Sequence, residues 1–367
     1  MFENLPVNPQ PYCDTLEVIE ADEGETALAL SRTMISIARK TFENSGHAIR
    51  SVHAKSHGIL HGALEVLPDL PPALAQGLFA QPGVYDAVMR LSSTPGDLLH
   101  DSVSTPRGIA IKVLEVPGDR LEGDVESRSQ DFVAVNGKQF NAASAKEFLK
   151  SLKLLAATTD RAEGFKKLAS KTLRGIETVV EALGGESAKL KALGGQPETH
   201  ILGESFFGQL PIRYGSYIAK FGIVPGCAEL RRLTDQHLDV DRSPNALREA
   251  VSDYFHRHNA VWDFQIQLCS NAAEMPIEDA SAVWDEAKSP FITVARLTAP
   301  RQESWDGDRS EVENDALGFR PWNALAAHRP LGSIMRIRRL AYRQSQDFRT
   351  ERNRHPVREP HLRDAAE

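Results

Sequence analysis

The segment Gly108-Ile-Ala-Ile-Lys-Val113 is short, apolar and alternating, which is typical of a β-strand. Ala63-Leu-Glu-Val66 and Ala87-Val-Met-Arg-Leu91 have the same character. Turn signals such as Pro82-Gly83 and Pro117-Gly118 separate these segments. The first third of the chain therefore contains several strands joined by tight connections.

Strand-rich and helical stretches alternate along the chain. Strands are expected at 48–135 and 210–297, with the clearest alternation at 261–268, and helices at 25–43, 144–193 and 322–348. This order indicates an α+β domain whose sheet can close into a barrel. We expect a single domain over 1–349 that contains a helical insertion at about 158–195. The tail at 350–367 has few core-forming residues, and we expect it to be mobile.

The composition is that of a soluble globular protein. The 367 residues include 41% apolar and 25% charged residues, and no apolar run approaches the roughly 18 residues of a membrane span. The net charge of −7 argues against binding to nucleic-acid phosphates. Three cysteines are too few for a disulfide framework or a zinc site, and neither a secretory signal nor a glycine-rich phosphate loop is present. We therefore expect a cytoplasmic protein.

The C-terminal helical stretch carries the most informative spacing. Arg338, Tyr342 and Arg349 fall within about 40° of one another on a helix with 100° per residue. A guanidinium group near a phenol lowers the pKa of the phenol and favours the phenolate, which can bind ferric iron. The same spacing is also compatible with a packed Tyr342 and solvated arginines.

Arg50-Ser-Val-His53-Ala-Lys55 opens the first strand-rich stretch. His53 is a candidate catalytic base, although a lone histidine is also compatible with a structural role. His53, His57 and His61 have the spacing of metal ligands on a helix, but two intervening glycines and the following strand indicate an extended segment. Successive histidines would then be about 13 Å apart, so we exclude a common metal site.

The order of several short motifs resembles that of the haem catalases. The matching motifs are Arg50-x-x-His53-Ala-Lys55, Met89-Arg90-Leu91-Ser92, Pro106-Arg107-Gly108-x-Ala-x-Lys112, Asp131-Phe-Val with Asn136, and Arg338-x-x-x-Tyr342 with Arg349. Each motif alone has low specificity, whereas their common order and spacing are specific. The resemblance covers about 48–349 without 158–195. The whole is similar to the small catalase-related peroxidases, which keep the haem-binding core.

The resemblance implies an antiparallel β-barrel with surrounding helices and one bound haem b with its iron. His53 matches the distal histidine that moves a peroxide proton, and Ser92 matches the serine that orients its ring. Tyr342 matches the axial ligand of the iron, and Arg338 would keep this phenol ionised. The remaining matches are Arg50, Arg90 and Arg349 for the haem propionates and Val52 and Phe148 for the apolar distal face.

The chain departs from the family at the distal amide. The catalytic asparagine of large catalases lies four residues after the Asp of Asp-x-Val, where this chain has Val135. Either a one-residue adjustment of the strand brings Asn136 into this role, or the amide is lost; we assign Asn136 as the catalytic amide. Arg343 and Gln346 replace a proline and a histidine near the axial tyrosine without removing the ligand.

These matches predict a haem-dependent peroxidase that uses small hydroperoxides and an organic reductant. The wrapping segments of large catalases are missing and Val135 is apolar, so we expect organic hydroperoxides to be favoured over dismutation of hydrogen peroxide. The alternatives are a fatty-acid hydroperoxide isomerase or dehydratase on the same scaffold and a non-catalytic haem-binding protein. We expect no nucleic-acid partner and no membrane span, and we allow for a homodimer.

Overall fold

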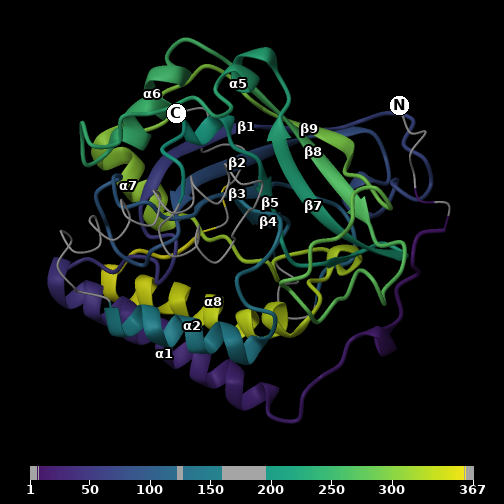
Figure 1. Cartoon of the computed structure of the whole chain (residues 1–367). Helices are drawn as coiled ribbons and strands as arrows, with labels where there is room; N and C mark the ends of the chain where they lie inside the picture. Colours follow the sequence, from purple (N-terminus) through teal and green to yellow (C-terminus); the bar gives the residue numbers. More distant parts are fainter. Residues whose placement is uncertain (1–5, 7, 122–126, 159–195, 359, 361–367) are drawn as a thin grey trace, which may run out of the picture.

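The computed structural model of the chain describes residues 6, 8–121, 127–158, 196–358 and 360. The described helices are α1 (Glu23–Ser45), α2 (Ala145–Thr158), α5 (Ala228–Arg232), α6 (Ala246–Phe255), α7 (Gly307–Ala316) and α8 (Ser333–Asn353). Helices α1, α2 and α8 lie together below a central barrel, whereas α5 and α6 lie above it (Figure 1). None of the helices in the described part of the chain is long and apolar enough to cross a membrane.

The barrel is built entirely from antiparallel strand pairs. Its strands are β1 (Ser56–Val66), β2 (Gly83–Ser93), β3 (Arg107–Val113), β4 (Gln130–Val135), β5 (Phe206–Phe207), β6 (Ile212–Tyr214), β7 (Tyr217–Pro225), β8 (Ala260–Leu268) and β9 (Ile292–Ala299). They are hydrogen-bonded in the order β5-β4-β3-β2-β1-β9-β8-β7-β6. Strand β5 also pairs with β7, which closes a ring of β1–β5 and β7–β9. The predicted α+β fold with an antiparallel barrel is confirmed.

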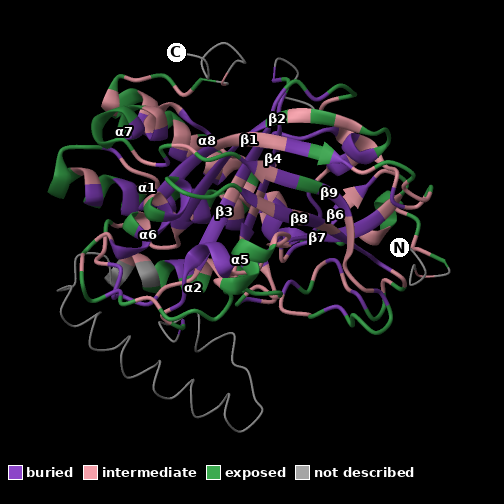
Figure 2. Ribbon diagram, turned by 90° about the horizontal axis from the view of Figure 1, so that it is seen from above, coloured by how far each residue is buried: buried purple, intermediate pink, exposed green. Residues whose placement is uncertain are grey.

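Alternation along the strands separates a barrel interior from an outer face. Phe132 of β4 and Phe264 of β8 meet inside the barrel with ring centroids 4.9 Å apart, and Phe79 lies 5.3 Å from Phe264. The strands are accordingly buried along much of their length (Figure 2). The segments predicted as strands at 63–66, 87–91, 108–113 and 261–268 lie within β1, β2, β3 and β8, so these predictions are confirmed.

The helical predictions hold in part. The helix expected at 25–43 is α1, and the stretch expected at 144–193 begins with α2. The rest of that predicted stretch, 159–193, lies outside the described residues. The start expected at Trp322 is wrong, because α8 begins at Ser333. Pro330 has no N–H to donate, and Gly332 adopts a φ of 85°, so the chain before Ser333 cannot be α-helical. Helices α5 and α6 interrupt the stretch at 210–297 that was expected to be strand-rich.

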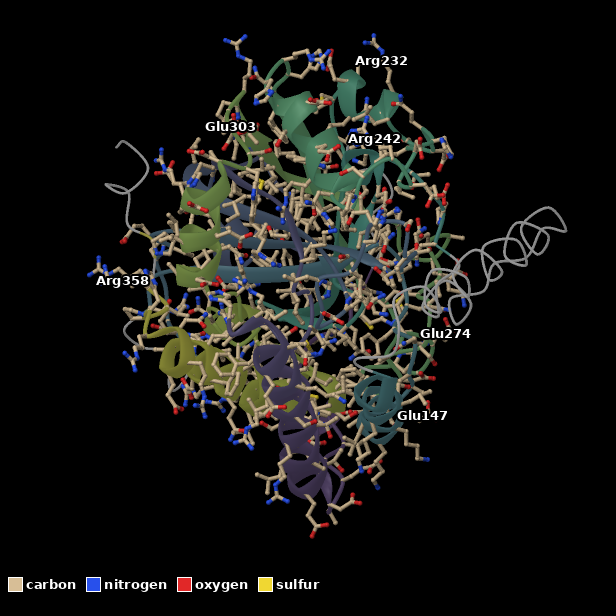
Figure 3. The ribbon with its side chains drawn as sticks, turned by 90° about the vertical axis from the view of Figure 1, so that its left-hand side faces the viewer. Glu147, Arg232, Arg242, Glu274, Glu303 and Arg358 are labelled. Carbon is tan, nitrogen blue, oxygen red and sulfur yellow. The ribbon has the colours of Figure 1, made fainter. Side chains whose placement is uncertain are left out.

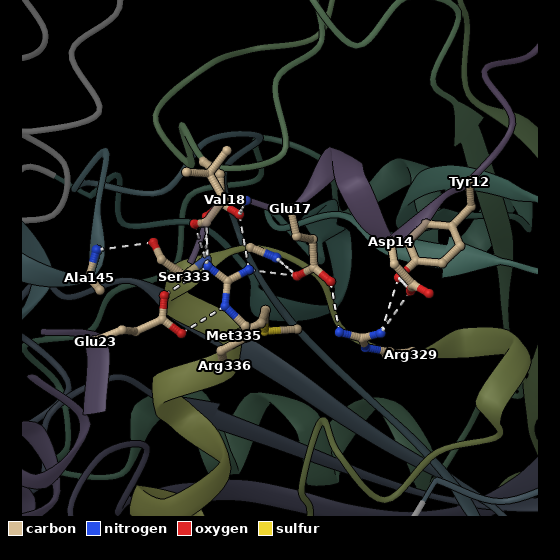
Figure 4. Close-up of polar contacts among 12 residues, drawn as sticks. Tyr12, Asp14, Glu17, Val18, Glu23, Ala145, Arg329, Ser333, Met335 and Arg336 are labelled. Carbon is tan, nitrogen blue, oxygen red and sulfur yellow. Dashed lines mark hydrogen bonds and ion pairs between the residues drawn. The ribbon is translucent and has the colours of Figure 1, made fainter. Parts of the chain in front are cut away.

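Arg336 of α8 is the centre of a buried ionic cluster. Whereas Arg232 projects from the surface (Figure 3), the Arg336 side chain is only 10% exposed. Its guanidinium donates to Glu17 Oε1 at 2.6 Å, Glu23 Oε1 at 2.7 Å and Glu278 Oε1 at 2.9 Å (Figure 4). These charge-assisted hydrogen bonds attach the N-terminal segment and the start of α1 to the first turn of α8.

Replacing Arg336 with methionine should lower the free energy of unfolding by about 3 kcal/mol, because three carboxylates would lose their common cation. Lys146 provides a control, since it pairs with Glu20 and Asp22 at the surface. Lys146→Met should leave the unfolding midpoint in urea unchanged. Equal losses of stability in the two variants would contradict a special contribution of Arg336.

Candidate active site

A cavity of about 1710 Å³ lies between the outer face of β2–β4 and helices α1, α2 and α8. It exceeds the roughly 300–1,000 Å³ of sites for drug-sized ligands, so a large cofactor and a substrate can fit together. The predicted residues that line it are Arg50, Val52, His53, Arg90, Ser92, Asn136, Phe148, Arg338 and Tyr342. Arg349 is the predicted residue that does not line the cavity; it is buried behind the wall.

His53 is held in an unusual backbone conformation on the barrel side of the cavity. Its φ is 53°, and its backbone N–H donates to Thr94 O at 2.8 Å. The ring Nδ1 lies 3.0 Å from Ser92 Oγ. A Cβ atom on Gly108 would lie 2.7 Å from His53 Cε1, so the ring fits only because residue 108 has no side chain. Such strain at a polar side chain in a cavity is typical of a functional site.

The register of three strands determines what surrounds the His53 ring. Ser92 pairs with Gly108 across β2 and β3, and Gly108 pairs with Val135 across β3 and β4. These three residues form one row, with neighbouring Cβ positions about 5 Å apart. His53 therefore packs over Gly108 with a hydroxyl on one side and the row ending in the apolar Val135 on the other.

Burial keeps the His53 imidazole neutral. Its pKa is lowered to about 3, first by desolvation and then by the positive charges of Arg90, Arg338 and Arg50. One ring nitrogen of a neutral histidine donates and the other accepts. If Nδ1–H donates to Ser92, then Nε2 is free to accept a proton.

Tyr342 and Arg338 reach the cavity from α8 on the opposite side. The Tyr342 hydroxyl has no hydrogen-bond partner among the described residues, although tyrosine hydroxyls in protein interiors usually find one. The Arg338 guanidinium lies 5.0 Å from the Phe140 ring centroid and 5.6 Å from that of Phe148. Tyr342 and Arg338 therefore present to the same cavity a phenol without a partner among the described residues and a guanidinium cation.

Three arginines gather at the edge of the cavity without a carboxylate in contact. Arg50 and Arg90 line it, and Arg349 lies behind them. None of the three forms an ion pair with a described residue, and Arg349 Nε has no hydrogen-bond partner there. Burial lowers the pKa of Arg90 to about 9 and that of Arg349 to about 10. Uncompensated positive charge of this kind indicates a site for an anionic group.

Asn136 lies at the cavity wall, but its amide is bonded to other residues. Its Oδ1 accepts the backbone N–H of Arg107 at 2.8 Å, and its Nδ2 donates to Glu204 at 2.7 Å and to Gln196 at 3.1 Å. Glu204 in turn forms an ion pair with the buried Arg107. Since an amide nitrogen has two hydrogens, both donors of Asn136 are in use. A catalytic role of Asn136 stays a prediction and requires this network to open.

No protein-family model matches the sequence, and no curated protein is similar to it. Solved catalases share its architecture. A fungal catalase has a TM-score of 0.60 at 15% identity, and a bacterial catalase has 0.57 at 16% identity. Catalase A from Saccharomyces cerevisiae has 0.60 at 15% identity, with 96% of this chain and 70% of that chain covered. The chain has the catalase fold.

The match to the catalase fold covers most of this chain and part of its neighbours. It includes 87% of the chain and 63% of the fungal catalase, and 88% of the chain and 62% of the bacterial one. The resemblance to catalases that the motifs predicted is confirmed at the level of the fold.

Two further residues contact the predicted site residues, although no motif in the sequence assigned a role to either of them. Asn314 accepts hydrogen bonds from Arg50 and Arg90, and Glu204 holds Asn136. Neither belongs to a local pattern, because their partners are distant in sequence. His57 and His61 lie away from His53 in separate environments: His57 is fully buried, whereas His61 pairs with Glu313.

Replacing His53 with glutamine should make the apoprotein less sensitive to acid. The pKa of His53 is about 3 in the folded chain and about 6.5 in the unfolded chain, so below pH 6.5 only the unfolded state binds this proton. Wild-type stability is therefore lost as the pH falls from about 6.5 toward 3. The difference in melting temperature, His53→Gln minus wild type, should increase as the pH is lowered from 7 to 4. A difference that is independent of pH would contradict a buried neutral His53.

Proposed function

We propose that this chain is a haem-dependent peroxidase that reduces hydroperoxides. The observation that carries the proposal is the arrangement across one cavity of a neutral His53 oriented by Ser92 and an unpartnered Tyr342 phenol. Three arginines without carboxylate partners add an anion site at the edge of the same cavity. The catalase fold of the chain supports this assignment.

The side chains present fit haem b. The Tyr342 hydroxyl would be available to hold the iron, and Arg338 of the same helix lines the cavity beside it. Arg50 and Arg90 would receive the propionates, which are the type of group that guanidinium recognises best. Val52 and Phe148 supply apolar contacts. When bound, haem supplies the iron that polarises the peroxide and takes up oxidising equivalents.

His53 would move one proton during the reaction. Its Nε2 would accept the proton of a bound hydroperoxide and return the same proton to the departing oxygen, which leaves as water or an alcohol. Ser92 would fix the ring by the contact with Nδ1, and Gly108 leaves the space that the ring occupies beside β3. A reductant of organic nature then restores the resting state.

Organic hydroperoxides are the substrates that this cavity favours. Val135 and Val52 line the same cavity as His53, and a hydrocarbon substituent that packs against them gains roughly 25 cal/mol for each Å² of apolar surface buried. The volume of about 1710 Å³ also leaves room for a substituent beside a large cofactor. Hydrogen peroxide has no group that benefits from either feature, so its dismutation should be slow.

Two substitutions should separate the roles of the cavity walls. Tyr342→Phe should lose haem or its phenolate spectrum, since it removes the axial oxygen. His53→Ala should keep near-stoichiometric haem and react with an alkyl hydroperoxide about 10²- to 10⁴-fold more slowly, because it removes proton transfer only. Haem titration and stopped-flow absorbance measure the two effects.

For each variant, a different result would contradict the proposal. An unaltered spectrum and full haem content in Tyr342→Phe would remove Tyr342 as ligand. Unchanged reaction rates in His53→Ala would remove His53 as the proton carrier and favour a non-catalytic haem-binding protein. Conversion of a fatty-acid hydroperoxide to a rearranged product without a reductant would indicate an isomerase or dehydratase instead.

Substrate preference should depend on Val135. In the wild type, kcat/KM for an alkyl hydroperoxide should exceed that for hydrogen peroxide with the same reductant. Val135→Asn should reduce this ratio by about 2- to 12-fold, because a hydrogen bond contributes about 0.5–1.5 kcal/mol. Val133→Asn is the matched control, since Val133 also lines the cavity but pairs with Ala110, one row away from Gly108. Rapid oxygen release from hydrogen peroxide by the wild type would contradict the expected preference.

A further inference from the structure

We propose that Asn314 is a positioning residue that orients Arg50 and Arg90 to receive two ligand carboxylates without neutralising them. The inference rests on the proposed function, since the carboxylates are the propionates of the cofactor. It adds a residue of α7 that touches neither substrate nor the reacting atoms.

The Asn314 side chain joins the two guanidiniums that line the cavity. Its Oδ1 accepts from Arg50 Nη1 at 2.9 Å and from Arg90 Nε at 2.8 Å. Its backbone oxygen accepts from Arg50 Nη2 at 2.8 Å. Asn314 is 7% exposed, so these contacts are protected from water. One amide oxygen therefore fixes the relative orientation of two side chains that belong to separate parts of the chain.

The end of α7 supplies further backbone acceptors for Arg50 and Arg349. Leu317 O accepts from Arg50 Nη2 at 2.8 Å and from Arg349 Nη2 at 3.3 Å, and Asp315 O accepts from Arg349 Nη1 at 3.3 Å. The last carbonyls of a helix have no partner within the helix and carry the negative end of its dipole. They therefore stabilise Arg50 and Arg349 with partial charges only, as Ala54 O does for Arg90.

Among the residues that the structure describes, no carboxylate is in direct contact with the guanidiniums of Arg50, Arg90 and Arg349. The Asp315 carboxylate pairs with His47 at 2.7 Å, and it acts on Arg349 and Arg50 only through space, as Glu311 does on Arg50 and Arg90. Burial and the mutual repulsion of the three arginines lower the pKa of Arg50. The cluster thus keeps positive charge available for a ligand.

An amide is suited to this task where a carboxylate is not. An arginine has five N–H donors. Arg50 uses three of them and Arg90 uses two in hydrogen bonds to the protein, which leaves donors on both for a ligand. A carboxylate at position 314 would form ion pairs with both arginines and compete with the ligand. The neutral Asn314 orients the donors and adds no competing charge.

The test uses the apoprotein with two metal-free probes, protoporphyrin IX and its dimethyl ester, whose binding is measured by fluorescence. Asn314→Asp should weaken binding of protoporphyrin IX at least about tenfold and change binding of the ester by less than about twofold. The same variant should melt at a higher temperature than wild type without ligand, because its carboxylate neutralises the arginines. Asn314→Leu, which removes the acceptor, should weaken protoporphyrin binding without raising the melting temperature.

Asn323→Asp is the matched control. Asn323 is also fully buried, and its Oδ1 also accepts from an arginine, Arg120 Nη2 at 2.9 Å, but it does not line the cavity. This variant should bind protoporphyrin IX within about twofold of wild type.

Two outcomes would overturn the inference: Asn314→Asp that binds protoporphyrin IX as tightly as wild type, or Asn314→Asp that loses the ester to the same degree. A variant that fails to fold would also contradict it, since higher stability is expected. Equal binding of protoporphyrin IX and its ester by the wild type would instead reject the propionate site of the proposed function.

Discussion

Closure of the barrel by the pairing of β5 with β7 is the constraint on which the site depends. A closed antiparallel sheet assigns every residue to the interior or to the outer face. Because Phe132 and Ala134 of β4 belong to the core, Val133 and Val135 must face the cavity. The same alternation and register place Ser92, Gly108 and Val135 in one row beneath His53. The pairing of the strands therefore determines which side chains surround His53 on the barrel side of the cavity.

The charged groups around the cavity are not arranged for maximum stability. A protein optimised for stability would pair Arg50, Arg90 and Arg349 with carboxylates, and the chain does so elsewhere, at Arg336 and Arg107. Here it offers backbone carbonyls and a neutral amide. Buried charge without a partner costs free energy, and a ligand that brings negative charge recovers it. Under the proposed function, the arrangement would exchange stability of the empty protein for affinity toward an anionic cofactor.

Local patterns predicted several of the residues that line the cavity, because these residues lie close together in the sequence. Arg338 and Tyr342 share a helical face, and Arg50 and His53 lie in one short segment, so spacing alone brought them together. The predicted helix start at Trp322 was wrong, because Pro330 and Gly332 prevent α8 from beginning before Ser333. Asn136 shows a different limit, since its partners Glu204 and Gln196 are far away in sequence and no spacing reveals that they occupy its amide.

The sequence by itself determined the alternation that forms the barrel strands, the helical face that carries Tyr342 and the choice of polar side chains in each motif. These depend on periodicities of two and 3.6 residues, which are local properties of the chain. The tertiary structure alone decided that Gly108 supports the His53 ring, that Arg349 lies behind the cavity wall, and that Asn314 joins two arginines. Such contacts join segments that become neighbours only when the barrel closes and the helices pack against it.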